Sequence, residues 1–140
     1  MGVSATIDQL SNVPLFSGCS AKELNLIARA VKEVSHREGK VIAREGEPGI
    51  GLFVIVEGTA KVTIGGQLKT KLGPGDFFGE IALLDGGPRT ATVTATSDIK
   101  LIGLTEWVFR GLLQEHPSIA MKTLQGLASR LRNASKSATA

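Results

Sequence analysis

The middle of the chain is built from short apolar runs broken by glycine, and this pattern most constrains the fold. Glycine-bearing breaks at residues 46–51, 65–66, 73–75 and 86–88 separate runs rich in β-branched and apolar residues. The expected strands are residues 41–42, 52–56, 61–64, 67–72, 90–96 and 99–104. Short, evenly spaced strands of this kind predict a jelly roll or barrel, with a tight hairpin at residues 64–67.

Helices are expected on both sides of the strands. Ser20 and Glu23 have the spacing of a capping box at the start of one helix. Thr105 is expected to cap a second helix, and Pro117 to open a third, where its missing N–H costs nothing. In the last helix a narrow apolar seam recurs at spacings of 4, 3 and 4, formed by Ala120, Leu124, Leu127 and Leu131. This seam would pair two chains or lie across the barrel.

Residues 78–93, with the sequence FGEIALLDGGPRTATV, contain the most informative polar groups. Arg89 has the same parity as Ala91 and Val93, so strict alternation places its guanidinium on the apolar face of a strand. An unpaired guanidinium there would cost several kcal/mol, so an anion is expected to meet it. Glu80 and a bound phosphate are the two candidates for that anion.

The residues around Gly79 favour the phosphate. Gly79 lets the backbone approach a ligand closely, and residues 80–84 can form one helical turn whose first amides have no internal partner. An anion held by these amides and by Arg89 would be fixed from two sides. Glu80 is an acceptor and suits a hydroxyl such as a ribose 2′-OH. The pattern therefore indicates a ligand with one phosphate and a nearby sugar hydroxyl.

FGEIALL, followed by PRTATV with Arg89 nine positions after Glu80, resembles the phosphate-binding cassette of cyclic nucleotide-binding domains. The glycine pattern in EGEPGIGLFVIVEG and the Gly75-Asp76-Phe77 step extend the resemblance to roughly residues 10–134. The resemblance implies a mainly β fold: an eight-stranded jelly-roll barrel with an N-terminal helical segment and two C-terminal helices. It also implies a single domain over residues 1–140, with residues 135–140 as a flexible tail.

The resemblance also implies a role for each matching position. Glu80 would bind the ribose 2′-OH and Arg89 the equatorial phosphate oxygen, while backbone amides near Ala82 and Thr90 complete the phosphate cradle. The full set of implied ligand-binding residues is Gly79, Glu80, Ile81, Ala82, Arg89 and Thr90. Val62 and Leu72 are expected as apolar walls against base and sugar.

Composition excludes several other classes. The single Cys19 cannot form an internal disulfide, and it is expected to be structural. His36 and His116 stand far apart, without a His-x-His or Gly-x-Ser-x-Gly motif, so neither an enzyme nor a metal site is expected. The chain has no signal-peptide pattern and no long apolar run, which predicts a cytoplasmic protein without membrane contact.

The net charge of +3 belongs to the C-terminal part of the chain. Residues 1–116 hold 12 basic and 13 acidic residues, which gives −1, whereas residues 117–140 hold four basic residues and no acid. A solvated helix face explains this better than nucleic-acid binding.

We therefore expect a non-catalytic sensor that binds a cyclic nucleotide and relays binding by movement of its C-terminal helix. Two alternatives remain: the sensory part of a DNA-binding regulator whose helix-turn-helix is absent from this chain, and a ligand-free structural or interaction domain with an internal Glu80–Arg89 ion pair. The partner would be an effector protein or a second copy bound through the C-terminal helix.

For this bacterial-type sequence cAMP is the expected ligand, with cGMP as the alternative. In the family a threonine at the position of Thr90 is common in cGMP-selective sites, and Ala134-Ser135 stands where catabolite-activator proteins carry a Thr-Ser pair that contacts adenine.

Overall fold

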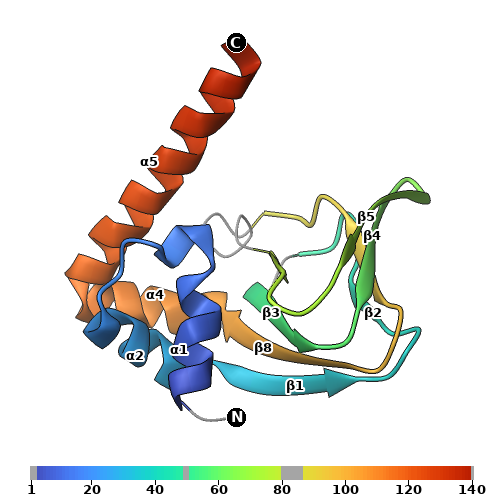
Figure 1. Ribbon diagram of the computed structural model, residues 1–140, viewed down its shortest axis with the longest axis horizontal. Helices are drawn as coiled ribbons and strands as arrows, with labels where there is room; N and C mark the ends of the chain where they lie inside the picture. The colour runs from blue at the N-terminus through green and yellow to red at the C-terminus, as the bar shows by residue number, and fades with distance from the viewer. Residues whose placement is uncertain (1–2, 49–50, 80–86, 140) are drawn as a thin grey trace. The chain divides into compact units, whose positions relative to one another are not determined.

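The computed structural model describes residues 3–48, 51–79 and 87–139 (Figure 1). The chain folds as two compact units, one of residues 31–109 and one of residues 1–30 together with 110–140. The expectation of a single domain over residues 1–140 stays a prediction. Among the described residues, no helix is both long enough and apolar enough to cross a bilayer.

The unit of residues 31–109 is a β jelly roll, as the sequence predicted. Its described strands are β1 Lys32–His36, β2 Val41–Ala43, β3 Gly51–Glu57, β4 Ala60–Ile64, β5 Gln67–Leu72, β6 Phe77–Phe78, β7 Thr92–Ala95 and β8 Ile99–Thr105. They form two antiparallel four-stranded sheets with the orders β1-β8-β3-β6 and β2-β7-β4-β5. Neighbours in each sheet are mostly far apart in sequence, which is how a jelly roll is wound.

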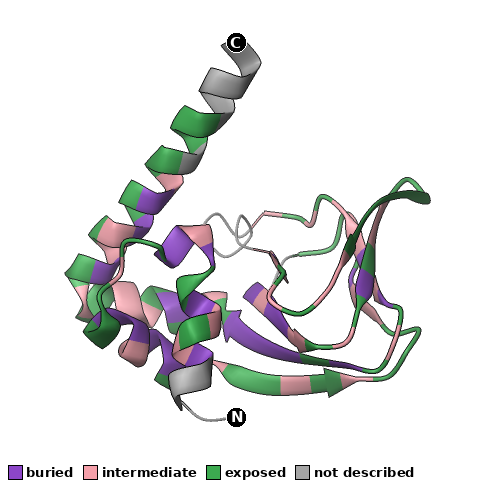
Figure 2. Ribbon diagram, in the orientation of Figure 1, coloured by how far each residue is buried: buried purple, intermediate pink, exposed green. Residues whose placement is uncertain are grey.

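The core of the β unit lies between the two sheets. Ile55 and Leu101 from one sheet and Val93 and Ala95 from the other belong to one buried cluster. Strand β8 is the most deeply buried, and its colour in Figure 2 contrasts with that of β1, which is exposed or half-buried throughout. Inward and outward positions alternate along β7, as expected for a strand with one face on the core.

The strand boundaries agree with the sequence pattern to within one residue except at β1, β6 and the start of β7. The β4–β5 hairpin turns at Gly65 and Gly66, whose φ angles of 58° and 80° suit a two-residue type I′ turn. Strands β1 and β6 were not expected, because β1 carries mostly polar residues and β6 has two residues only. Strand β7 begins at Thr92 and not at residue 90.

The other unit is helical. It contains α1 Val3–Ser11, the 3-10 helix η1 Pro14–Phe16, α2 Ala21–Ala30 and α5 Pro117–Thr139. Helix α4, Glu106–Glu115, begins directly after Thr105, whose hydroxyl accepts a 3.4 Å hydrogen bond from the Val108 N–H. Helix α5 begins at Pro117, so both expected helix starts are confirmed. Helix α5 includes residues 135–139, which were expected to form a tail.

Helix α5 buries the predicted seam only in part, since Ala120 and Leu127 are half-buried. Ile119 and Thr123 are buried, whereas Leu124 and Leu131 are 59% and 63% exposed. Gly126 allows the close approach to η1, since a Cβ there would lie 2.8 Å from the Leu15 carbonyl oxygen. This backbone approach to η1 places Gly126 on the buried side of α5, and the apolar spacing does not encode it.

The capping box of α2 forms as predicted. The Ser20 N–H donates to Glu23 Oε1 at 2.8 Å, and the Glu23 N–H donates to Ser20 Oγ at 3.2 Å. The Ser20 N–H, with further help from the Ser118 hydroxyl, lowers the pKa of Glu23 below its ordinary value of 4.5. Nearby, burial is the main cause that raises the pKa of the Cys19 thiol to about 11, which disfavours the reactive thiolate and agrees with a structural role.

The lowered pKa of Glu23 predicts a pH-dependent contribution to stability. A carboxyl group whose pKa is lower in the folded state stabilises the fold above its unfolded pKa and loses this contribution as pH falls. We expect the stability advantage of the wild type over Glu23→Gln to be largest near pH 6 and to shrink as pH falls below about 4.5. Urea unfolding of both proteins between pH 3 and 6 measures this difference, and an advantage that is constant over this range would contradict the assignment.

Candidate ligand-binding site

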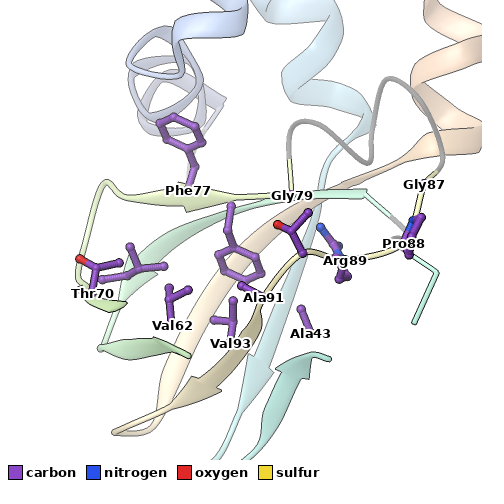
Figure 3. Close-up of a pocket in the computed structure, with 13 residues that line it drawn as sticks. Ala43, Val62, Thr70, Phe77, Gly79, Gly87, Pro88, Arg89, Ala91 and Val93 are labelled. Carbon is purple, nitrogen blue, oxygen red and sulfur yellow. The ribbon is translucent and has the colours of Figure 1, made fainter. Parts of the chain in front are cut away.

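The β unit contains a cavity of about 550 Å³. This size lies within the range of small-molecule sites in proteins. The thirteen lining residues are Ala43, Val62, Thr70, Leu72, Phe77, Phe78, Gly79, Gly87, Pro88, Arg89, Thr90, Ala91 and Val93 (Figure 3). Arg89 carries the only charged side chain among them, so the described wall is apolar with one cationic end.

Arg89 is held in place through both its backbone and its side chain. Its N–H donates to the Glu47 carbonyl at 2.8 Å, and its carbonyl accepts from the Gly46 N–H at 2.9 Å. In the half-buried side chain, Nη2 donates to the Gly51 carbonyl oxygen at 2.8 Å. These bonds join Arg89 to the turn that follows β2 and to the first residue of β3, so the guanidinium is oriented before any ligand binds.

Gly79 lies against this guanidinium, and no other residue type fits there. Its φ angle is +90°, a conformation that residues with a Cβ rarely adopt. A Cβ would also collide with Arg89 Nη1 and with the Gly51 carbonyl oxygen. Figure 3 shows the Arg89 side chain extending toward Gly79. The glycine therefore brings the backbone at the end of β6 next to the cation.

The floor of the cavity is a row of directly paired residues across one sheet. Ala43 on β2 pairs with Val93 on β7, Val93 pairs with Val62 on β4, and Val62 pairs with Thr70 on β5. Because opposed residues in antiparallel strands share a face, all four side chains point into the cavity. This row gives a flat apolar surface that ends at a hydroxyl.

The structure brings together the described residues that the sequence singled out. Gly79, Arg89, Thr90, Val62 and Leu72 all line the cavity. The other three residues of the implied ligand set, Glu80, Ile81 and Ala82, lie outside the described residues. The roles assigned to all eight residues remain proposals.

One local expectation about Arg89 was wrong. Arg89 does not begin a strand, because β7 starts three residues later, at Thr92. The predicted parity still holds, since Arg89, Ala91 and Val93 all line the cavity. Thr90 lines it too, although strict alternation points it away, because the segment before β7 lacks regular strand geometry.

Sequence reasoning missed Ala43 and Thr70. Thr70 lies in the predicted strand 67–72, whereas Ala43 lies one residue beyond the predicted strand 41–42. Pairing between strands identifies the face that the two residues share.

A comparison with known families decides the classification. Residues 33–116, more than half of the chain, match the model of the cyclic nucleotide-binding domain. The chain belongs to this family. The match includes every described residue that lines the cavity.

Similar proteins carry this domain as one part of a longer chain. A cyclic nucleotide-gated potassium channel from Mesorhizobium japonicum is 42% identical over 108 residues, which are 77% of this chain and 30% of the channel. A CRP-like cAMP-activated global transcriptional regulator from Mycobacterium tuberculosis is 31% identical over 130 residues, which are 88% of this chain and 57% of the regulator. The chain thus spans less than two thirds of either relative.

A solved structure supports the same classification. The crystal structure of the N-terminal domain of a transcriptional regulator from Streptomyces coelicolor A3(2) superposes with a TM-score of 0.85 at 32% identity, covering 91% of this chain and 94% of that domain. The cyclic nucleotide-binding domain described here therefore shares its fold with the N-terminal domain of that transcriptional regulator.

Proposed function

We propose that this chain is a non-catalytic sensor that binds cAMP in the cavity of its β unit. The observation that carries the proposal is the pre-oriented Arg89 guanidinium beside Gly79, at one end of an otherwise apolar cavity. A cyclic phosphate would bind to Arg89, and the purine would lie on the floor formed by Val62 and Val93. The residues proposed to bind ligand are Gly79, Glu80, Ile81, Ala82, Arg89 and Thr90, with Val62 and Leu72 as walls.

The cavity supports a ligand-binding module over a ligand-free interaction domain. The hydrogen bond from Arg89 Nη2 to the Gly51 carbonyl oxygen holds the guanidinium at the cavity, where a bound phosphate would make a charge-assisted interaction with it. In the ligand-free alternative, Glu80 instead forms an ion pair with Arg89. The two hypotheses differ in whether a cyclic nucleotide binds at all, which a titration measures.

The proposed output is a change in helix α5. The similar proteins are a gated channel and transcriptional regulators, whose names describe regulated and not catalytic proteins. A ligand that binds two states of α5 unequally would shift their populations. The exposed Leu124 and Leu131 then offer a surface for an effector or a second copy of the chain.

The identity of the base is proposed on two observations. The regulator from Mycobacterium tuberculosis is described as cAMP-activated, which supports cAMP. Thr90 lines the cavity beside Arg89, and its hydroxyl is the feature that favours cGMP as the alternative. Replacing Thr90 with a residue that lacks the hydroxyl should weaken cGMP binding more than cAMP binding.

The proposed role of Glu80 gives a direct test with a matched ligand pair. We expect Glu80→Ala to weaken cAMP binding by about tenfold or more, since a hydrogen bond to a charged group contributes about 1.5–3 kcal/mol. The same substitution should have little effect on 2′-deoxy-cAMP, which lacks the hydroxyl. Fluorescence competition with both ligands measures this. An equal loss for the two ligands would contradict the ribose role, and a wild type that binds neither would contradict the proposed function.

A further inference from the structure

Glu45 joins two parts of the β unit that are distant in sequence. Its carboxylate oxygen Oε1 accepts a 2.9 Å hydrogen bond from the Gly65 N–H, and the Thr92 hydroxyl donates to the same oxygen at 3.5 Å. The Glu45 N–H in turn donates to Thr92 Oγ1 at 3.1 Å. One half-buried residue therefore connects the turn of the β4–β5 hairpin to the first residue of β7.

The bond to Gly65 restrains the hairpin at its tip. Pairing between β4 and β5 ends at Ile64 and Gln67, so the Gly65 N–H lies outside the ladder of strand hydrogen bonds. Strand β5 is the last strand of its sheet, and its outer edge pairs with no described strand. Because Val62 lines the cavity from this hairpin, Glu45 helps to fix one wall of the cavity.

The residues that follow Glu45 hold the backbone of Arg89. The Gly46 N–H donates to the Arg89 carbonyl oxygen at 2.9 Å, and the Glu47 carbonyl oxygen accepts from the Arg89 N–H at 2.8 Å. These two bonds place residues 45–47 directly beside the backbone of Arg89. A shift of this segment would therefore move the guanidinium at the cavity.

Glu45 is the best-anchored residue of its segment. Arg44 and residues 46–48 are exposed, whereas Glu45 is half-buried. An exposed segment with few buried contacts is displaced easily, and hydrogen bonds to a carboxylate are stronger than those between neutral groups. The bonds of Glu45 are therefore suited to keep the segment, and with it Arg89, in one position.

We propose that Glu45 is a positioning residue, which holds Arg89 in place for the phosphate by anchoring residues 45–47 to the β4–β5 hairpin and to β7. Glu45 is absent from the described cavity lining, so it would act through Arg89 and not by touching the ligand. This inference rests on the proposed function, because it takes Arg89 as the residue that binds the phosphate.

The test compares charge-matched variants by calorimetric titration with cAMP. Glu45→Ala removes the carboxylate and its hydrogen bonds, whereas Glu45→Gln removes the same charge and keeps an oxygen that can accept both bonds. Glu47→Ala is the control in the same segment, because the Glu47 side chain is 62% exposed and pairs with Arg44 on the surface. Thr92→Val removes the second partner of Glu45 without changing a described lining residue, and it carries the test if Glu45→Ala does not fold.

We expect Glu45→Ala to weaken cAMP binding by about fivefold relative to Glu45→Gln, the typical effect of one hydrogen bond. Thr92→Val should also weaken cAMP binding, because it loosens the same anchor. Glu45→Gln and Glu47→Ala should stay within about twofold of the wild type. Circular dichroism checks that each variant is folded.

Arg89→Lys as a background separates positioning from a general structural role. A lysine ammonium is a point charge on a flexible stem, so its contact with a phosphate depends less on the position of its backbone. The loss caused by Glu45→Ala should therefore shrink to within about twofold in this background. A loss of the same size in both backgrounds would reduce Glu45 to a structural role, and equal affinities of Glu45→Ala and Glu45→Gln would overturn the inference alone. A folded wild type that binds no cyclic nucleotide would overturn the proposed function as well.

Discussion

Replacing Arg89 with alanine is expected to weaken cAMP binding by about a hundredfold, because the proposed charge-assisted interaction between the guanidinium and the phosphate would be lost. The β unit should still fold, since Arg89 is half-buried and lies outside the hydrophobic cluster between the two sheets. Arg89→Lys should recover part of the affinity, because a lysine keeps the charge and loses the paired geometry of the guanidinium. Titration calorimetry measures the affinities, and circular dichroism checks the fold.

Arg44→Ala is the matched control for this experiment. Arg44 is exposed and pairs with the exposed Glu47 at 3.6 Å, an ion pair of small energetic effect. Its loss removes one positive charge from the same unit without touching the cavity, so cAMP affinity should stay unchanged. If Arg89→Ala binds cAMP as tightly as Arg44→Ala does, the assignment of the phosphate site is wrong.

Gly79→Ala is expected to have the second large effect, on both stability and binding. The strained φ of +90° and the collision with the Gly51 carbonyl together should lower the free energy of unfolding by about 2 kcal/mol or more. Since the added methyl group also meets the Arg89 guanidinium, cAMP affinity should fall by about tenfold or more. Chemical denaturation and titration of the same preparation measure the two effects.

Gly39→Ala separates backbone strain from the collision. Gly39 also has φ of +90°, but a Cβ there would have no neighbour within 4 Å. This variant should therefore be destabilised by the backbone strain alone, and it should bind cAMP with wild-type affinity. Equal stability losses and equal cAMP affinities in the two variants would show that crowding at Gly79 is unimportant.

Local chemistry made part of this fold predictable. Ser20 with Glu23, and Gly65 with Gly66, are short motifs in which neighbouring residues satisfy one another's hydrogen bonds or supply a required φ angle. The parity of Arg89 with Val93 identified residues that line the cavity, although the irregular segment before β7 brings Thr90 to the cavity as well.

The rest depends on pairing between distant segments. The extra residue Lys69 appears only when β5 is aligned with β4, and it places Leu68 on the face opposite to Thr70 and Leu72, which line the cavity. The approach of Gly126 to the η1 backbone places this residue on the buried side of α5, whereas the apolar spacing favoured the face of Leu124. Neither relation is visible within one segment of sequence.

The most direct test of the central claim is a calorimetric titration of the wild-type chain with cAMP, cGMP and 5′-AMP. We expect that one cAMP binds per chain, that cGMP binds more weakly, and that 5′-AMP binds much more weakly than either cyclic nucleotide. Binding of 5′-AMP as tight as that of cAMP would contradict a site built for a cyclic phosphate. No heat with any of the three, for folded and ligand-free protein, would contradict the sensor function itself.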